Sequence, residues 1–152
     1  MSVAVLRPND WDLPLFLHVL GAMVLVGTLV VAVAAFAGEW RAREARHAAA
    51  LRRLAFGALL VGALPSYVLM RVGAEWIGSE ENVDELDAAW VDIGNVIANL
   101  GLLVLIAATV IAWIAVRRGA AGGPLGRVAA VLSAVLLAAY VVAVWAMTTK
   151  PD

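Results

Sequence analysis

The stretch Leu13–Gly38, LPLFLHVLGAMVLVGTLVVAVAAFAG, runs for 26 residues without a charged side chain. A helix needs roughly 20 apolar residues to cross about 30 Å of hydrocarbon, so this stretch predicts a transmembrane helix. Three more uncharged stretches follow, Leu54–Met70, Ile93–Val116 and Val128–Thr149, with 17, 24 and 22 residues. Arg71 can lengthen the shortest span by turning its charged group outward. The sequence predicts four spans, over residues 12–38, 52–74, 88–116 and 127–148.

The composition agrees with this class of protein. Of the 152 residues, 64% are hydrophobic and only 15% are charged, and the mean hydropathy is +0.92. Continuous apolar stretches favour helices, because strands of a membrane barrel alternate apolar and polar residues. Asp10 and Asp12 precede the first stretch where a signal peptide has basic residues, so we expect that stretch to stay in the mature protein. We predict a single all-α domain, an antiparallel four-helix bundle in the membrane.

Charge is distributed unevenly between the two predicted sides. Eight of the eleven basic residues lie in the first and third connections: Arg41, Arg43, Arg46, Arg52, Arg53, Arg117, Arg118 and Arg127. The second connection carries six acids, Glu75, Glu80, Glu81, Asp84, Glu85 and Asp87. By the positive-inside rule, both termini and the acidic connection lie outside the cytoplasm, as in a multi-pass protein of a bacterial inner membrane. Because topology alone accounts for these arginines, nucleic acid is not an expected partner.

The predicted connections have distinct local features. The connection Glu39–Arg53 has arginines spaced among alanines and is predicted to be a helical extension near anionic lipid. Pro65 is expected to kink the second span, because proline removes a backbone hydrogen bond. Asn82 with Glu85 predicts a start of the third helix before it enters the bilayer. Gly119–Gly126, rich in glycine, predicts a tight flexible turn.

The polar residues that are costly to place inside a membrane gather towards the outer leaflet. His18 lies roughly 9 Å below the outer boundary of its span, and Asn95 lies at a similar depth. Two groups of residues have the spacing of an interior helix face. They are His18, Gly21, Leu25 and Thr28 in the first span, and Asp92, Asn95 and Asn99 in the third. We expect these two faces to lie opposite each other. The predicted cofactor site contains His18, Tyr67, Arg71, Asp92, Asn95 and Asn99, with His18 and Met147 as metal ligands.

Each of these residues has a second interpretation. His18 can hydrogen-bond Asn95 or a backbone carbonyl, ligate haem or a metal, or transfer protons. Asn95 and Asn99 can join helices, and Arg71 can snorkel to the interface or hold an anion such as a haem propionate. The absence of cysteine excludes disulfides and thiolate sites. No motif for a hydrolytic site or a phosphate loop is present, so an enzyme is not favoured.

The first span also carries a recognisable motif. Leu17-His18-Val19-Leu20-Gly21-Ala22, followed by Gly27, resembles the first-helix pattern LHxLGAxxxxG of small bacterial membrane families. These families include four-helix proteins related to the copper-resistance D membrane domain, and the closing Trp145–Pro151 resembles the end of such proteins. The distantly similar membrane protoporphyrinogen oxidase implies that His18 is an axial ligand of haem b. Because His47 lies on the predicted cytoplasmic side, a second ligand must be a methionine, water or another protomer's His18.

Two hypotheses therefore stay open. In the first, the chain binds haem b or copper in its outer-leaflet half through His18. In the second, it is a non-catalytic membrane subunit or a small-solute permeation protein, and His18 and Asn95 are interhelical packing contacts. The expected partners are the lipid bilayer and a second copy of the chain or another membrane protein.

Overall fold

The computed structural model describes residues 12–81 and 89–149, and nearly all of them are helical. The helices are α1 (Asp12–Arg41), α2 (Ala45–Gly57), the π-helix η2 (Ala58–Ala63), α3 (Leu64–Glu81), α4 (Ala89–Arg117), the 3-10 helix η4 (Gly119–Gly122) and α5 (Gly123–Thr149). Four helical segments in this part of the chain are long and apolar enough to cross a membrane: Leu13–Arg41, Ala45–Gly78, Gly94–Arg117 and Gly119–Thr149. The all-α class is thus confirmed, with four helices that are long and apolar enough to span a membrane.

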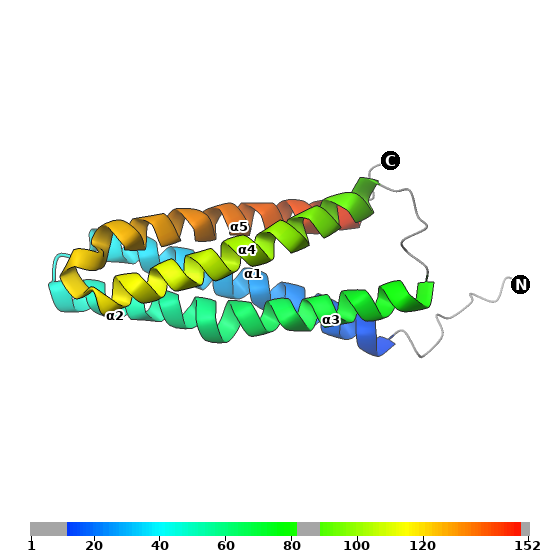
Figure 1. The fold of residues 1–152 in the computed structure, drawn as a ribbon, viewed down its shortest axis with the longest axis horizontal. Coiled ribbons are helices and arrows are strands. Elements are labelled where there is room, and N and C mark those ends of the chain that lie inside the picture. The colour runs from blue at the N-terminus through cyan, green and yellow to red at the C-terminus, as the bar shows by residue number, and fades with distance from the viewer. Residues whose placement is uncertain (1–11, 82–88, 150–152) are drawn as a thin grey trace, which may run out of the picture.

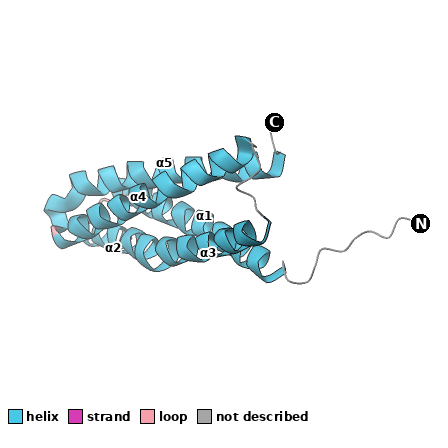
Figure 2. Ribbon diagram, turned by 45° about the vertical axis from the view of Figure 1, so that its right-hand side comes forward, coloured by secondary structure: helices cyan, strands magenta, loops and turns pink. Residues whose placement is uncertain are grey.

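The helices form two antiparallel hairpins (Figure 1). The first pairs α1 with the continuous helix α2–η2–α3, and the second pairs α4 with α5. The hairpins pack together where α1 meets α2 and diverge towards the opposite end, as the turned view in Figure 2 also shows. We call the first the arginine end, which carries Glu39, Arg52 and Gly119, and the second the histidine end, which carries His18, Arg71 and Asn95.

The core follows from small residues that recur every three or four positions. In α4 the buried residues are Gly94, Ala98, Gly101, Leu105, Ala108, Thr109, Ala112 and Ala115, and in α5 they include Gly126, Ala129, Ser133, Leu136, Tyr140 and Ala143. This is the spacing of knobs-into-holes packing, and glycine and alanine let helix backbones approach closely. The opposite faces are apolar and exposed, with Met23 69% and Val61 74% exposed, as lipid-facing residues are.

Two of the three predicted connections lie within the described residues, and one of them differs from the prediction. The extension after the first span is helical as predicted, with α1 reaching Arg41 and α2 starting at Ala45. The predicted helix start at Asn82 lies outside the described residues. The predicted turn Gly119–Gly126 is too long, because η4 ends at Gly122 and α5 begins at Gly123. Gly119 makes the turn with a φ of 57°, a conformation that glycine adopts without a steric penalty.

Pro65 is accommodated without ending its helix. The π-helix Ala58–Ala63 ends two residues before Pro65. In an ordinary α-helix, the proline ring would clash with the carbonyl four residues earlier, which belongs to this π-helix. A π-helical turn holds more residues than an α-helical turn, so the buried Ala55, Leu59, Ala63 and Tyr67, each four positions after the last, stay in one core. The helix therefore stays continuous from α2 through α3.

Candidate functional site

His18 joins α1 to α3 at the histidine end. Its Nδ1 lies 3.0 Å from the carbonyl oxygen of Met70, and the imidazole is half-buried. Because a carbonyl can only accept a hydrogen bond, Nδ1 must carry the proton and donate it. Nε2 is then left as an acceptor with a free lone pair. Of the roles predicted for His18, the described contacts show one, which is hydrogen bonding to a backbone carbonyl.

The helices α1 and α3 touch through their backbones around His18. A Cβ atom on Gly73 would lie 2.6 Å from the amide nitrogen of His18 and 2.7 Å from the carbonyl oxygen of Pro14. A Cβ atom on Gly21 would lie 2.8 Å from the carbonyl oxygen of Ser66. Both glycines thus permit a close crossing of the two helices. No space for a flat cofactor is left between α1 and α3 at this crossing.

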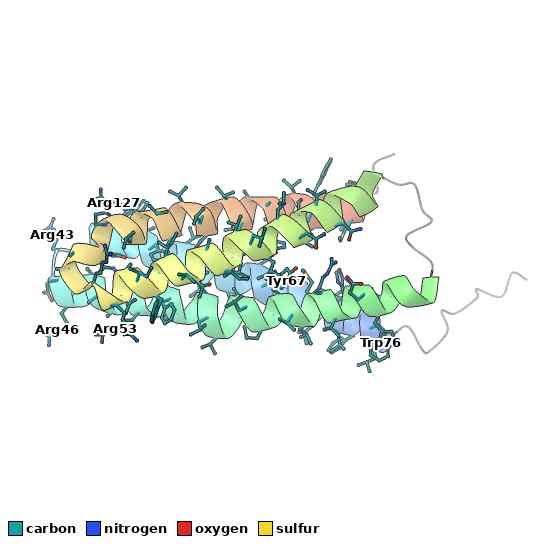
Figure 3. The ribbon with its side chains drawn as sticks, viewed as in Figure 1. Arg43, Arg46, Arg53, Tyr67, Trp76 and Arg127 are labelled. Atoms are coloured by element: carbon teal, nitrogen blue, oxygen red, sulfur yellow. The ribbon has the colours of Figure 1, made fainter. Side chains whose placement is uncertain are left out.

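The other predicted site residues of α3 and α5 have partners of their own. The Tyr67 hydroxyl donates to the Ala98 carbonyl at 3.1 Å, which links the two hairpins (Figure 3). Arg71 forms an ion pair with Glu75 one turn along the same helix, at 2.7 Å. The terminal methyl of Met147 packs on Gly94 of α4, where a Cβ would lie 2.7 Å away. The structure thus uses Tyr67 and Met147 to hold helices together.

The expected face-to-face arrangement of the His18 and Asn95 groups is wrong. Asn95 and Asn99 are exposed on α4, and within the described residues neither makes a side-chain hydrogen bond. The buried face of α4 begins instead with Gly94 and Ala98, one position earlier and about 100° around the helix. Glycine and alanine pack closer than asparagine, so they take the interior. Asp92 belongs to α4, but its side chain lies outside the described part.

A metal centre is not assembled in the described part of the chain. Residues 12–81 and 89–149 contain no group of three or more histidine, aspartate or glutamate side chains that could hold a metal ion. His18 supplies one imidazole nitrogen, while Met147 contacts the other hairpin at Gly94. The predicted six-residue pocket stays a prediction, because the side chain of Asp92 lies outside the described part and Asn95 and Asn99 are exposed.

A buried ion pair at the arginine end was not predicted. Arg52 of α2 donates to Glu39 of α1 through Nε at 2.8 Å and also through Nη2. Its Nη1 donates to the carbonyl oxygens of Ala115, at 3.4 Å, and of Gly119. The side chains of Arg52 and Glu39 are only 7% and 5% exposed. This Arg52 network thus ties α1 and α2 to the end of α4.

The sequence does contain a signal for this pair. Arg52 stands three residues before the buried Ala55, and Glu39 stands four residues after the buried Ala35, so both continue the buried face of their helices. Because Arg52 and Glu39 were treated only as charges of a connection, this spacing was overlooked. The Oε2 atom of Glu39 has no hydrogen-bond partner among the described residues and faces Gly126 of α5, whose Cβ would lie 3.2 Å away. Glycine at 126 therefore lets α5 pack against the carboxylate.

A shallow apolar groove of about 180 Å³ follows the contact between α4 and α5. Its walls include Val96, Leu100 and Val104 of α4 and Val135 and Ala139 of α5. A groove without polar side chains on the lipid-facing side of a bundle suits an acyl chain and offers no groups for chemistry.

No protein-family model, curated protein or solved structure matches the chain at a significant level. The described residues form a helical bundle with four helices long and apolar enough to cross a membrane, as in a multi-pass membrane protein. The resemblance to the copper-resistance D and protoporphyrinogen oxidase families stays a prediction from the motif around His18.

Proposed function

We propose that this chain is a non-catalytic membrane subunit that assembles with a second copy of itself through the exposed face of α4. In this proposal the arginine end faces the cytoplasm of a bacterial inner membrane and both termini lie outside, as the positive-inside rule requires. The observation that carries the proposal is the pair of exposed asparagines on α4. No catalytic step is proposed.

The asparagines begin a regular stripe along α4, which we call the α4 stripe: Asn95, Asn99, Leu103, Ile106 and Val110. Its members are four, four, three and four positions apart, so they share one helix face. All are exposed, with Leu103 at 65% and Ile106 at 44%. The stripe thus has the spacing of a helix-packing face, but none of the helices in residues 12–81 and 89–149 covers it.

An unpaired amide at the depth of Asn99 is costly. From Asn99 to Arg117 the helix rises about 27 Å, less than the roughly 30 Å of the hydrocarbon layer. With Arg117 at the polar boundary, Asn99 lies inside the apolar layer, where an amide without a partner is unfavourable. An amide is both donor and acceptor, so two copies related by a twofold axis can satisfy each other. Interhelical hydrogen bonds of this kind contribute up to about 1–2 kcal/mol in model peptides.

Cysteine crosslinking tests this assembly, since the chain has no cysteine of its own. Leu103→Cys places a thiol in the α4 stripe, and Val61→Cys places one on the exposed face of η2. With a short bis-maleimide in membranes, we expect a dimer band from Leu103→Cys and little from Val61→Cys. Adding Asn99→Leu to Leu103→Cys should lower the dimer fraction about fivefold or more, because the amide pair is lost. Equal crosslinking at both positions would contradict the proposal.

A second candidate function is ligation of one haem b or metal ion by His18. It is favoured by the hydrogen bond from Nδ1 to the Met70 carbonyl, because metal-bound histidines commonly donate their other ring nitrogen in this way. The remaining neighbours fit less well, since Tyr67 and Arg71 have protein partners and Asn95 is exposed on α4. A second ligand would have to come from water or from another copy.

The absorption spectrum of protein purified with haem available tests this second candidate. We expect a Soret band that disappears in His18→Ala and persists in His47→Ala, because His47 is exposed at the arginine end. A colourless wild type, or a band that both variants keep, would exclude His18 as the ligand. If His18 acts only in packing, His18→Ala should instead lower stability by about 1 kcal/mol with no spectral change.

A further inference from the structure

The arginine end is surrounded by exposed guanidinium groups, which we call the arginine rim: Arg41, Arg43, Arg46, Arg53, Arg117, Arg118 and Arg127. Among the described residues at this end, the acids are Glu39, which is occupied by Arg52, and the exposed Glu44. Figure 3 shows Arg127 on the α5 side of the bundle and Arg46 and Arg53 on the opposite side. The excess positive charge therefore lies on opposite sides of the bundle rather than in one flat patch.

Two tryptophans fix the level of the arginine rim relative to a bilayer. Trp40 is 55% exposed beside Arg41, and Trp113 is 43% exposed one turn before Arg117. The guanidinium of Arg117 lies over the Trp113 ring, 4.7 Å from its centre. This contact holds the charge against the side of the helix. Exposed tryptophans at the ends of apolar helices mark the membrane interface, so the rim lies at the depth of lipid headgroups.

We infer that the arginine rim binds the phosphate groups of anionic phospholipids in the surrounding leaflet. Ten of the eleven basic residues of the chain are arginine, and the planar guanidinium binds a phosphate through two parallel hydrogen bonds, which a lysine cannot do. Lipids surround a membrane protein on every side, so they can contact charges on opposite sides of the bundle. A nucleic acid or an acidic protein docks from one direction and would reach only part of it.

The lipids that stay bound in nanodiscs test this inference. In discs of nine parts phosphatidylcholine to one part phosphatidylglycerol, native mass spectrometry should find phosphatidylglycerol enriched among the retained lipids. The ratio of phosphatidylglycerol to phosphatidylcholine among the retained lipids, relative to the ratio in the disc, should fall about fivefold for each arginine removed in Arg117→Gln and Arg127→Gln. It should also fall in high salt, which screens charges at this exposed depth.

Matched variants distinguish the binding of a lipid headgroup by arginine from attraction by positive charge alone. Arg71→Gln removes the same charge at the histidine end, where Arg71 pairs with Glu75, and should leave the enrichment unchanged. Arg117→Lys with Arg127→Lys keeps the charge and the topology signal, and should retain only part of the enrichment because the paired hydrogen bonds are lost. Retained lipid of bulk composition, equal loss in Arg71→Gln, or displacement by inorganic phosphate at the same concentration would overturn the inference.

Discussion

Arg52→Met should lower the free energy of unfolding by about 3–5 kcal/mol, the largest effect expected of any single substitution in this chain. The substitution leaves Glu39 buried without its counter-charge and removes the donor to the carbonyls of Ala115 and Gly119. Uncompensated buried charge is far costlier than the loss of a surface ion pair. Reversible unfolding in mixed detergent micelles, followed by circular dichroism, measures the change.

Arg53→Met is the matched control for Arg52→Met. Arg53 is the next residue and is exposed, and its substitution removes the same charge. Arg53→Met should therefore change the free energy of unfolding by less than about 0.5 kcal/mol. The double variant Glu39→Leu, Arg52→Met should recover most of the loss, because an apolar pair replaces the buried ions. If Arg52→Met and Arg53→Met unfold alike, the Arg52 network contributes nothing measurable to the fold.

Gly21→Val should destabilise the bundle by about 1–3 kcal/mol or more, the range for overpacking a close contact. A Cβ on Gly21 would lie 2.7 Å from the Cα of Met70 and 2.8 Å from the carbonyl oxygen of Ser66. These are backbone atoms that cannot rotate away, so α1 and α3 must separate. Separation would also break the hydrogen bond from His18 to Met70. The same unfolding assay reports the loss.

Gly27 supplies the control on the same helix, because a Cβ there meets nothing within 4 Å. Gly27→Val should be near neutral, since the gain in helix propensity over glycine is small and no contact is disturbed. Gly73→Ala should be destabilising for the same reason as Gly21→Val, and Gly78→Ala, with open space around it, should not. Equal stability of the Gly21 and Gly27 variants would show that α1 and α3 do not cross closely at Gly21.

The elements of this fold could be predicted from the sequence because the membrane imposes a simple rule. An uncharged stretch such as Leu13–Gly38 has few alternatives to a spanning helix. The helical nature of the connection before Arg53 followed from its alanines and arginines. What the pattern could not supply was the length of the turn after Gly119, because Pro124 is tolerated inside the first turn of α5.

The candidate site was harder to predict because neighbouring residues on a helix point in very different directions. The sequence placed His18 on a packing face, and a backbone carbonyl was one of its expected partners. For α4, the face containing Asn95 and the face containing Gly94 have the same spacing, so periodicity could not choose between them. Which face of α4 packs inside the bundle depends on how closely the backbone of the neighbouring helix approaches. A close approach favours the face that carries glycine. Polar residues on α4 thus went outward, against the usual tendency in membrane helices.

The ribosome makes the partners of Arg52 at widely different times. Glu39 lies 13 residues before Arg52, so their ion pair can close once the first hairpin has been inserted. The carbonyls of Ala115 and Gly119 come 63 and 67 residues after Arg52, when the third span is complete. Until then, one guanidinium nitrogen of Arg52 lacks its protein acceptors. Docking of the second hairpin therefore supplies the acceptors that complete the Arg52 network.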